Sequence, residues 1–235
     1  MALDRSRVTD PREVSRLFSR IAPRYDLLNR IMSLGQDRGW RGQLLDLIAD
    51  TRGPILDLCA GTGDVALLAR RSFPGRLVVA ADASAGMLRQ GRARADSIPL
   101  AGWVLADATS LPLREGKFGA LTVAFGVRNV IALDRLLDGA MRVLRPGGRL
   151  AILDIFAPSN DLLGRGYSIY LRHFVPALGA AVGGDGAAYR HLAASVHAFG
   201  RPEELAARLA SAGFANARYR AMNLGTIGLV WGDRR

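Results

Sequence analysis

Residues 55–64 read Ile55-Leu56-Asp57-Leu58-Cys59-Ala60-Gly61-Thr62-Gly63-Asp64, and they are the strongest indication of the class of fold. A short apolar run ends at a carboxylate and a glycine loop, and a helix-length segment follows. Glycines between a strand and a helix allow a ligand to approach the backbone closely, and the helix N-terminus offers N–H groups beside it. We therefore expect Gly61 and Gly63 to bind a cofactor. The loop also fits the dinucleotide pattern G-x-G-x-x-A, so by itself it does not identify that cofactor.

Outward from this loop, short apolar runs alternate with helix-length segments. The expected strands are 55–59, 77–81, 103–106, 121–125 and 150–156, and the expected helices between them are 65–71, 85–95 and 133–144. A helix at 202–212 and two strands at 217–222 and 226–231 would close the sheet with an antiparallel edge. The alternation predicts an α/β fold with a doubly wound, mostly parallel seven-stranded sheet, in which ligands bind beyond the carboxyl ends of the strands.

The rest of the chain is expected to be helical and to belong to the same single domain, residues 1–235. Residues 1–50 predict a helical cap, which begins with an amphipathic helix over 14–21. Residues 157–200 predict a helical lid inserted over the site. The cofactor-binding core is then 51–156, and residues 201–235 supply the last helix and the closing hairpin.

Composition excludes several classes of function. Cys59 is the only cysteine, so neither an internal disulfide nor a multi-cysteine metal site is expected, and we expect no metal. No apolar run reaches the roughly 18 residues that span a bilayer, and no secretory signal is apparent, so a cytoplasmic protein is expected. The net charge is +11, but the basic residues are scattered arginines apart from Lys117. That distribution is typical of a solvated basic face, and among specific partners it favours an anionic membrane surface over nucleic acid.

Two carboxylates at strand ends narrow the choice of cofactor. Asp57 ends the first strand, where an anion suits the ammonium and sulfonium of S-adenosylmethionine and would repel a pyrophosphate. Alternatively, Asp57 braces the loop by hydrogen bonds. Asp82 ends the second strand and can accept both ribose hydroxyls of an adenosine, a feature shared with dinucleotide enzymes. Its alternative role is the N-cap of the following helix.

Further residues favour a methyl donor. Asp107 and Ala108 follow the third strand, where the carboxylate would meet the adenine amino group, and Met87 could pack on the base. Asp107 is otherwise an ordinary loop aspartate. The turn at 145–149 is typical of methyltransferases, and dinucleotide enzymes have no reason to carry it. Together these features predict methyl transfer from S-adenosylmethionine.

The chain closely resembles the ubiquinone/menaquinone biosynthesis C-methyltransferases over nearly its whole length. The most specific segments are Phe18 with Ile21-Ala22-Pro23-Arg24-Tyr25-Asp26-Leu27-Leu28-Asn29, then Ser33-Leu34-Gly35-Gln36-Asp37-Arg38-Gly39-Trp40-Arg41, and Phe125-Gly126-Val127-Arg128-Asn129-Val130. The resemblance implies cofactor contacts at Thr62, at Asp82 and at the pair Asp107 and Ala108. A serine usual in the family is Ala124 here, so its hydroxyl contact is absent or replaced by a water.

Other departures concern the acceptor. The family's Tyr-x-Tyr-Leu-x-Glu-Ser stands here as Tyr189-Arg190-His191-Leu192-Ala193-Ala194-Ser195, without the glutamate and one tyrosine. A histidine usual near the end is Val230. An altered lid and Val230 could mark a different acceptor.

The implied reaction, carbon methylation of a quinol, is aided by a group that stabilises the phenolate. Arg128 stays protonated and could stabilise that charge or position a water, unless it pairs with a carboxylate. Asn129 could orient the hydroxyl or cap the next helix, and Tyr25 with Asp26 could close over the ring, although Tyr25 could also be core. Isolated histidines are more often structural, but three are candidates for the proton acceptor: His173, His191 and His197.

The expected acceptor is a prenylated quinol, most of all demethylmenaquinol in menaquinone or ubiquinone biosynthesis. The arginine-rich amphipathic segment before Pro23 would then dock on the inner membrane surface, and we allow for a homodimer. Two alternatives stay open: methylation of another lipid or aromatic acceptor, such as a phospholipid amine, and a nicotinamide-dependent oxidoreductase on the same fold.

Overall fold

The computed structural model of the chain describes residues 19, 30–95, 98–157, 169, 195–196 and 199–235. The helix expected over 14–21 and most of the lid expected over 157–200 lie outside these residues, apart from a few positions. The helices are α2 (Asp37–Asp46), α3 (Asp64–Ser72), α4 (Ala85–Arg94), α5 (Leu133–Val143) and α9 (Pro202–Ser211), with 3-10 turns η1 (Val127–Asn129) and η3 (Asn223–Gly225). The strands are β1 (Ile55–Leu58), β2 (Val78–Asp82), β3 (Gly102–Leu105), β4 (Phe118–Ala124), β5 (Leu144–Ile155), β6 (Ala215–Met222) and β7 (Ile227–Asp233).

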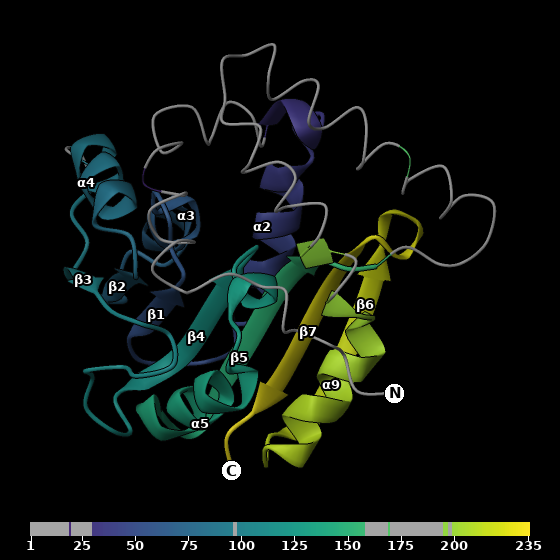
Figure 1. Cartoon of the computed structure of the whole chain (residues 1–235). Helices are drawn as coiled ribbons and strands as arrows, with labels where there is room; N and C mark the ends of the chain where they lie inside the picture. Colours follow the sequence, from purple (N-terminus) through teal and green to yellow (C-terminus); the bar gives the residue numbers. More distant parts are fainter. Residues whose placement is uncertain (1–18, 20–29, 96–97, 158–168, 170–194, 197–198) are drawn as a thin grey trace.

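The seven strands form one sheet in the order β3-β2-β1-β4-β5-β7-β6, which confirms the predicted fold class (Figure 1). β1 lies between β2 and β4, with Ile55 in register with Val78 on one side and Ala120 on the other, both parallel. The strand order therefore reverses beside β1, and at such a switch point the carboxyl ends of the strands border a ligand crevice. β7 is antiparallel to both β5 and β6, so the expected antiparallel strand lies inside the sheet and β6 forms the edge.

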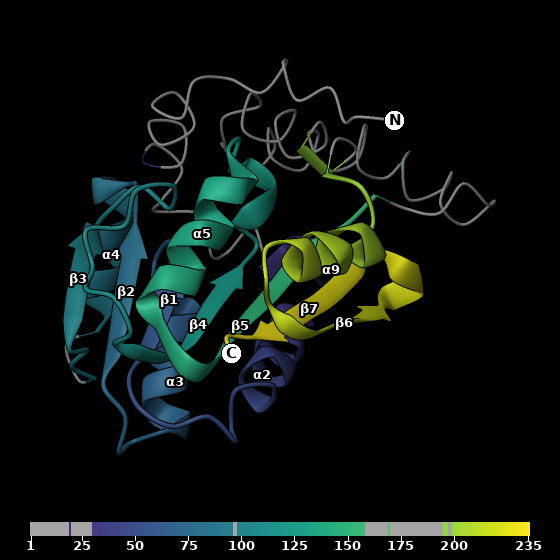
Figure 2. The same cartoon turned by 90° about the horizontal axis from the view of Figure 1, so that it is seen from below.

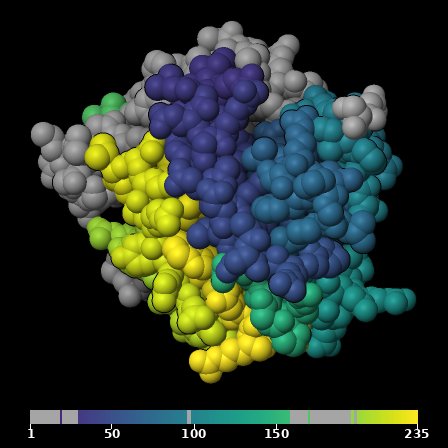
Figure 3. Space-filling view, turned by 180° about the vertical axis from the view of Figure 1, so that it is seen from behind, coloured from purple at the N-terminus to yellow at the C-terminus, as the bar shows by residue number. Residues whose placement is uncertain are grey.

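Helices cover both faces of the sheet, α5 and α9 on one and α2 and α3 on the other (Figures 1 and 2). α5 packs through a stripe of fully buried residues, Leu136, Leu137 and Ala140, which the helical periodicity predicts. These residues share a cluster with Leu56 and Leu150 of the sheet. From behind, α2 fills the surface between the C-terminal hairpin and α3 (Figure 3).

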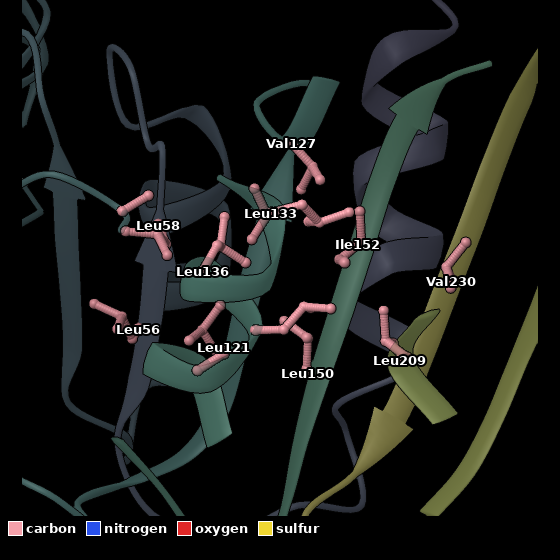
Figure 4. Packing of buried hydrophobic residues seen from close by; sticks show 14 of the residues in the cluster. Leu56, Leu58, Leu121, Val127, Leu133, Leu136, Leu150, Ile152, Leu209 and Val230 are labelled. Carbon is pink, nitrogen blue, oxygen red and sulfur yellow. The ribbon is translucent and has the colours of Figure 1, made fainter. Parts of the chain in front are cut away.

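Val230 belongs to the α5–α9 cluster and is fully buried. It lies on β7 beside Leu209 of α9 (Figure 4), and it pairs with Ile152 across the sheet. Val230 thus has a structural place in the hydrophobic core, and its interpretation as a mark of a different acceptor stays a prediction.

The turn expected at 145–149 is part of β5. Phe118 pairs with Leu144 and Ala120 with Arg149, so the intervening residues of β5 bulge out of the ladder. A Cβ on Gly148 would lie 2.9 Å from the carbonyl oxygen of Arg145, so the bulge requires a glycine there. The turn at 145–149 therefore has a structural role in the pairing of β4 with β5.

The described residues that follow β5 and those that precede α9 lie side by side. The amide of Ala157 donates to the carbonyl of Gly200 at 3.0 Å. The rings of Phe156 and Phe199 stack with centroids 5.1 Å apart. The insertion expected over 157–200 stays a prediction. In the described part of the chain, no helix has both the length and the apolar character needed to cross a membrane.

Candidate functional site

A cavity opens at the switch point, where β1 and β4 end. Its lining comprises Arg41 of α2, Asp57, the loop residues Cys59, Ala60, Gly61 and Thr62, Asp64 and Val65 of α3, and Ala124 and Phe125 after β4. The backbone turns sharply on both sides of it, because Cys59 and Phe125 have φ of +55° and +57°. Residues other than glycine rarely adopt a positive φ. Those that do are enriched at ligand sites. A Cβ on Gly126 would overlap that of Cys59, so the two turns pack directly together.

Asp57 braces the glycine loop from the end of β1. Its Oδ2 accepts a hydrogen bond from the amide of Ala66 at 3.0 Å, and its Oδ1 accepts one from the Thr122 hydroxyl at 2.9 Å. Burial raises the pKa of Asp57 to about 7, against the opposing effect of these bonds and of Arg41. The bracing role considered for Asp57 is therefore present, and the same residue lines the cavity.

Asp82 joins the glycine loop to the end of β2. Its Oδ2 accepts from the amide of Gly61 at 2.8 Å and its Oδ1 from the amide of Ser84 at 2.7 Å. Burial raises the pKa of this carboxyl as well. The N-cap of α4 is Ser84, whose hydroxyl accepts from the amide of Met87 at 3.2 Å. The alternative role of Asp82 as the helix cap is thus wrong.

The two loop glycines have different reasons to be glycine. Gly61 has φ of +57°, and a Cβ there would meet nothing within 4 Å, so only its conformation requires glycine. Gly63 has φ of +82°, and a Cβ there would lie 2.5 Å from Cη2 of Trp103. Trp103 also fills the space beside Gly91 of α4, where a Cβ would lie 2.6 Å from the same atom. Gly63 therefore makes room for the packing of α3 and α4 on Trp103, a reason that the loop pattern alone does not reveal.

The hydroxyl of Thr62 and the carboxylate of Asp64 are both held by one side chain. Arg94 of α4 donates from Nη1 to Thr62 Oγ1 at 2.9 Å and from Nη2 to Asp64 Oδ1 at 2.8 Å. Thr62 is buried and lines the cavity. The contact expected of Thr62 with the cofactor stays a prediction.

The residues expected at the adenine end lie beyond the cavity, after β3 and on α4. Asp107 Oδ1 accepts from both the amide and the hydroxyl of Thr109, each at 2.8 Å, as in an ordinary turn. Ala108 and Met87 are buried, with 7% and 2% of their surface exposed. Together with Asp82 they follow the carboxyl edge of the sheet from β2 to β3, and their contact with adenine stays a prediction.

Arg128 is buried and paired with Asp154, the pairing that we weighed against a role in the reaction. Its Nη1 lies 2.5 Å from Asp154 Oδ1 and donates to the carbonyl of Phe125 at 2.7 Å. Its amide donates to Asp154 Oδ2 at 3.1 Å. Arg128 thus fixes the turn that follows β4. Asn129 lies in η1, whereas the N-cap position of α5 is Ala132, without a side-chain hydrogen bond.

Several candidates lie outside the described residues. These are Tyr25 and Asp26 of the cap and His173, His191 and His197 of the lid. Ser19, the described residue of the cap before Arg30, lies 2.7 Å from Ser84 through the two hydroxyl oxygens.

Arg41 is a site residue that we did not predict from the sequence. It lines the cavity, its Nη1 pairs with Asp37, and its guanidinium carbon lies 5.4 Å from the centre of the Phe125 ring. The spacing of Asp37 and Arg41 on one helix face was the available signal. That signal did not indicate that the pair would be buried against the glycine loop.

The family model described as the ubiE/COQ5 methyltransferase family matches residues 6–234. The chain belongs to the ubiE/COQ5 methyltransferase family. It is 43% identical to a demethylmenaquinone methyltransferase of Thermus thermophilus, over 93% of this chain and 100% of that protein. It is 42% identical to a ubiquinone/menaquinone biosynthesis C-methyltransferase of Syntrophotalea carbinolica, over 93% of this chain and 92% of the relative.

Among solved structures, a SAM-dependent methyltransferase of Thermotoga maritima, described as a possible histamine N-methyltransferase, has a TM-score of 0.67. The two chains are 18% identical, and the match covers 94% of this chain and 99% of the other, so this likeness supports the fold alone. As a member of the ubiE/COQ5 methyltransferase family, the chain is a methyltransferase that uses S-adenosylmethionine.

The charges that line the cavity are of the kinds that the methionine part of S-adenosylmethionine would require. Arg41 supplies a cation on one wall, and Asp57 and Asp64 supply carboxylates, which matches an ammonium and a carboxylate on one ligand. Ala124 lines the cavity with a methyl group, so its side chain offers no hydroxyl there. Of the altered lid segment, Ser195 alone is described, and it is buried.

Proposed function

We propose that this chain transfers a methyl group from S-adenosylmethionine to a ring carbon of a prenylated quinol, most of all demethylmenaquinol. The observation that carries the proposal is the match with the Thermus thermophilus demethylmenaquinone methyltransferase across the whole of that protein. The cavity at the switch point supports it, since it combines a glycine loop with charges of both signs. Fold alone would not select this acceptor.

When bound, S-adenosylmethionine supplies a methyl group on a positively charged sulfur. We assign its ammonium to Asp57 and its ribose hydroxyls to Asp82, which already bonds the loop at Gly61. Thr62, Gly63 and Ala124 would border the cofactor beside Gly61. At the far end, adenine would lie against Met87, Asp107 and Ala108.

On the acceptor side, the enzyme's main contribution is alignment of the ring carbon with the methyl group. Arg128 keeps its charge, and its bonds to Asp154 and the Phe125 carbonyl hold the turn beside the cavity. We propose that Arg128 acts through this turn and through its positive charge, while Asn129 orients the quinol hydroxyl. Tyr25 and Asp26 of the cap would close over the ring.

We also propose peripheral contact with a membrane, from which a prenylated quinol must be drawn. The segment before Pro23 is one candidate face. A second is an exposed patch of Leu34 and Leu224, 84% and 72% exposed. Their turns are joined by a hydrogen bond of 3.0 Å from Asn223 Nδ2 to Gln36 Oε1. β6 runs parallel to β5, so η3 lies at the same edge of the sheet as the cavity. The homodimer stays a prediction.

The acceptor is tested by offering labelled S-adenosylmethionine with three acceptors in parallel: demethylmenaquinol, a demethoxy-type benzoquinol and phosphatidylethanolamine. We expect label on the quinol ring carbon. Label found only on the phospholipid would overturn the quinone assignment in favour of a lipid methyltransferase. Tighter binding of a nicotinamide nucleotide than of S-adenosylmethionine would overturn methyl transfer itself.

The membrane contact is tested by flotation with anionic liposomes. We expect Leu34→Ser with Leu224→Ser, and separately the removal of residues 1–20, to reduce the bound fraction. Leu77→Ser is the matched control, because Leu77 is 63% exposed but precedes β2 at the opposite edge of the sheet. Equal binding by all variants would contradict the proposal.

A further inference from the structure

The guanidinium of Arg41 is buried beside the cofactor cavity. Arg41 lies on α2, its side chain is 7% exposed, and it borders the same space as Asp57 and Gly61. A charge taken out of water in this way requires hydrogen-bonded anions around it. The partners that the folded chain provides therefore indicate what else the site is built to hold.

Those partners leave one edge of the guanidinium without close hydrogen bonds. Nη1 is committed to Asp37, whereas Nη2 lies 3.3 Å from Asp64, longer than the 2.7–2.9 Å usual for a charge-assisted bond. Nε is buried and has no hydrogen-bond partner among the described residues. Nε and Nη2 carry the two parallel N–H groups of one guanidinium edge, which is the edge that binds a carboxylate with both oxygens.

Asp64 does not depend on Arg41 for its charge balance. Arg94 Nη2 lies 2.8 Å from Asp64 Oδ1, so Asp64 keeps a close cation if Arg41 turns to a ligand. Asp37 likewise keeps its bond from the Ser33 hydroxyl, at 2.9 Å, together with Nη1 of Arg41. The Nε–Nη2 edge can thus bind a ligand without leaving a buried carboxylate alone.

The remaining neighbours fix the direction of this edge. The ring of Phe125 lies 5.4 Å from the guanidinium carbon of Arg41, and Trp40 packs edge-on against the same ring. Phe125 itself is held at the end of β4 by a bond of 2.7 Å from its amide to the carbonyl of Leu153. A guanidinium placed in this way meets a carboxylate with little loss of side-chain freedom.

We propose that Arg41 binds the α-carboxylate of S-adenosylmethionine through Nε and Nη2, opposite the Asp57 carboxylate that receives the ammonium. This assignment rests on the proposed binding of that cofactor in the cavity. It makes Arg41 the residue through which the enzyme distinguishes an intact methionine group from a cofactor fragment that lacks the carboxylate.

The test is calorimetric binding of two ligands, S-adenosylhomocysteine and its decarboxylated analogue, to the full chain. Hydrogen bonds to a charged group are worth about 1.5–3 kcal/mol, so we expect the wild type to prefer the carboxylated ligand by roughly 10-fold to 100-fold. In Arg41→Met the preference should fall to about 1-fold to 3-fold, and in Arg41→Lys to an intermediate value, because lysine keeps the charge without the paired N–H groups.

Arg208→Met is the matched control, since it removes an exposed arginine of α9 that pairs with Asp134 away from the cavity, and it should leave both affinities and their ratio unchanged. Circular dichroism of each variant verifies that it is folded, and Arg41→Lys keeps the test valid if Arg41→Met does not fold. An undiminished preference in Arg41→Lys and Arg41→Met would overturn this assignment alone. Failure of the wild type to bind S-adenosylhomocysteine would overturn the proposed cofactor site and this assignment with it.

Discussion

Arg128 and Asp154 form an ion pair of 2.5 Å, with side chains only 5% and 0% exposed. Asp154 lies near the end of β5 and also accepts from the amide of Arg128, so one carboxylate fixes both the side chain and the backbone of the turn after β4. In a buried pair each charge depends on the other for compensation. The turn that borders the cavity is thereby tied to the stability of the fold.

Removal of the Asp154 carboxylate should destabilise the folded chain. We expect Asp154→Ala to lower the free energy of unfolding by about 3–5 kcal/mol, because it leaves a buried arginine without its counter-ion. The measurement is urea denaturation at pH 7. Asp134→Ala is the matched control: Asp134 pairs with Arg208 at 2.6 Å but is 79% exposed, so its loss should cost about 0–1 kcal/mol. Similar losses in the two variants would contradict the expectation.

Asp57 should make stability depend on pH in an unusual direction. Its pKa is raised from 3.8 to about 7 in the folded chain, so the folded state holds a proton that the unfolded state has released. The stabilisation is complete below pH 3.8 and is lost as the pH rises through about 7. Relative to Asp57→Asn, we expect the wild type to lose about 2 kcal/mol of stability between pH 5 and 7, measured by urea denaturation.

The same carboxyl should couple cofactor binding to pH. Ionised Asp57 attracts an ammonium more strongly than protonated Asp57 does, so binding should tighten as the pH rises from 6 to 8. Calorimetry with S-adenosylhomocysteine measures this dependence. In Asp57→Asn the affinity should be weaker and nearly constant over that range, and a parallel pH profile in both proteins would count against Asp57 as the ammonium partner.

Gly63 should be intolerant of a side chain for a steric reason. Gly63→Ala places a Cβ 2.5 Å from Trp103 in addition to straining a positive φ, whereas Gly147→Ala strains a φ of +75° with nothing within 4 Å. We expect the control to cost about 1–2 kcal/mol and Gly63→Ala to cost more. Thermal unfolding of both variants measures the difference. Adding Trp103→Phe should recover part of the loss in Gly63→Ala and none in Gly147→Ala.

Gly119 of β4 should not tolerate any side chain. A Cβ there would overlap the carbonyl oxygen of Arg52, and a backbone atom cannot swing aside. Gly119→Ala should therefore cost more than about 3 kcal/mol or prevent folding. Gly102→Ala in β3 adds a Cβ whose nearest neighbour is 3.9 Å away, so it should change stability little. Equal yields of soluble protein and equal melting temperatures would refute the difference.

Much of the fold could be predicted from the sequence, because its strands are short apolar runs between clear breaks. β1 and β2 agree with the expected strands to within a residue or so at each end. β5 differs because it begins at Leu144, ahead of the bulge, where pairing with Phe118 continues across an interruption that looks like an ordinary turn. Strand pairing through a bulge depends on the partner strand, which local sequence does not specify.

The site was predictable where it follows the strand ends. Asp57 and Asp82 could be located because the carboxyl ends of parallel strands meet at one edge of the sheet. Arg41 and Asp154 could not, since each reaches the site only through the packing of a different element against the loop or turn. The steric need for glycine at position 63 could not be predicted either, because Trp103, which requires it, lies on β3 at the edge of the sheet.

The position of β7 determines when the sheet can assemble during synthesis of the chain. β7 is the last strand in the sequence, yet it lies between β5 and β6 and pairs with both. During synthesis, β5 and β6 leave the ribosome before the strand that separates them. The edge of β5 is then unpaired and exposed to mispairing. The sheet can therefore be completed only once β7 has emerged, and until then β5 and β6 have no partner strand between them.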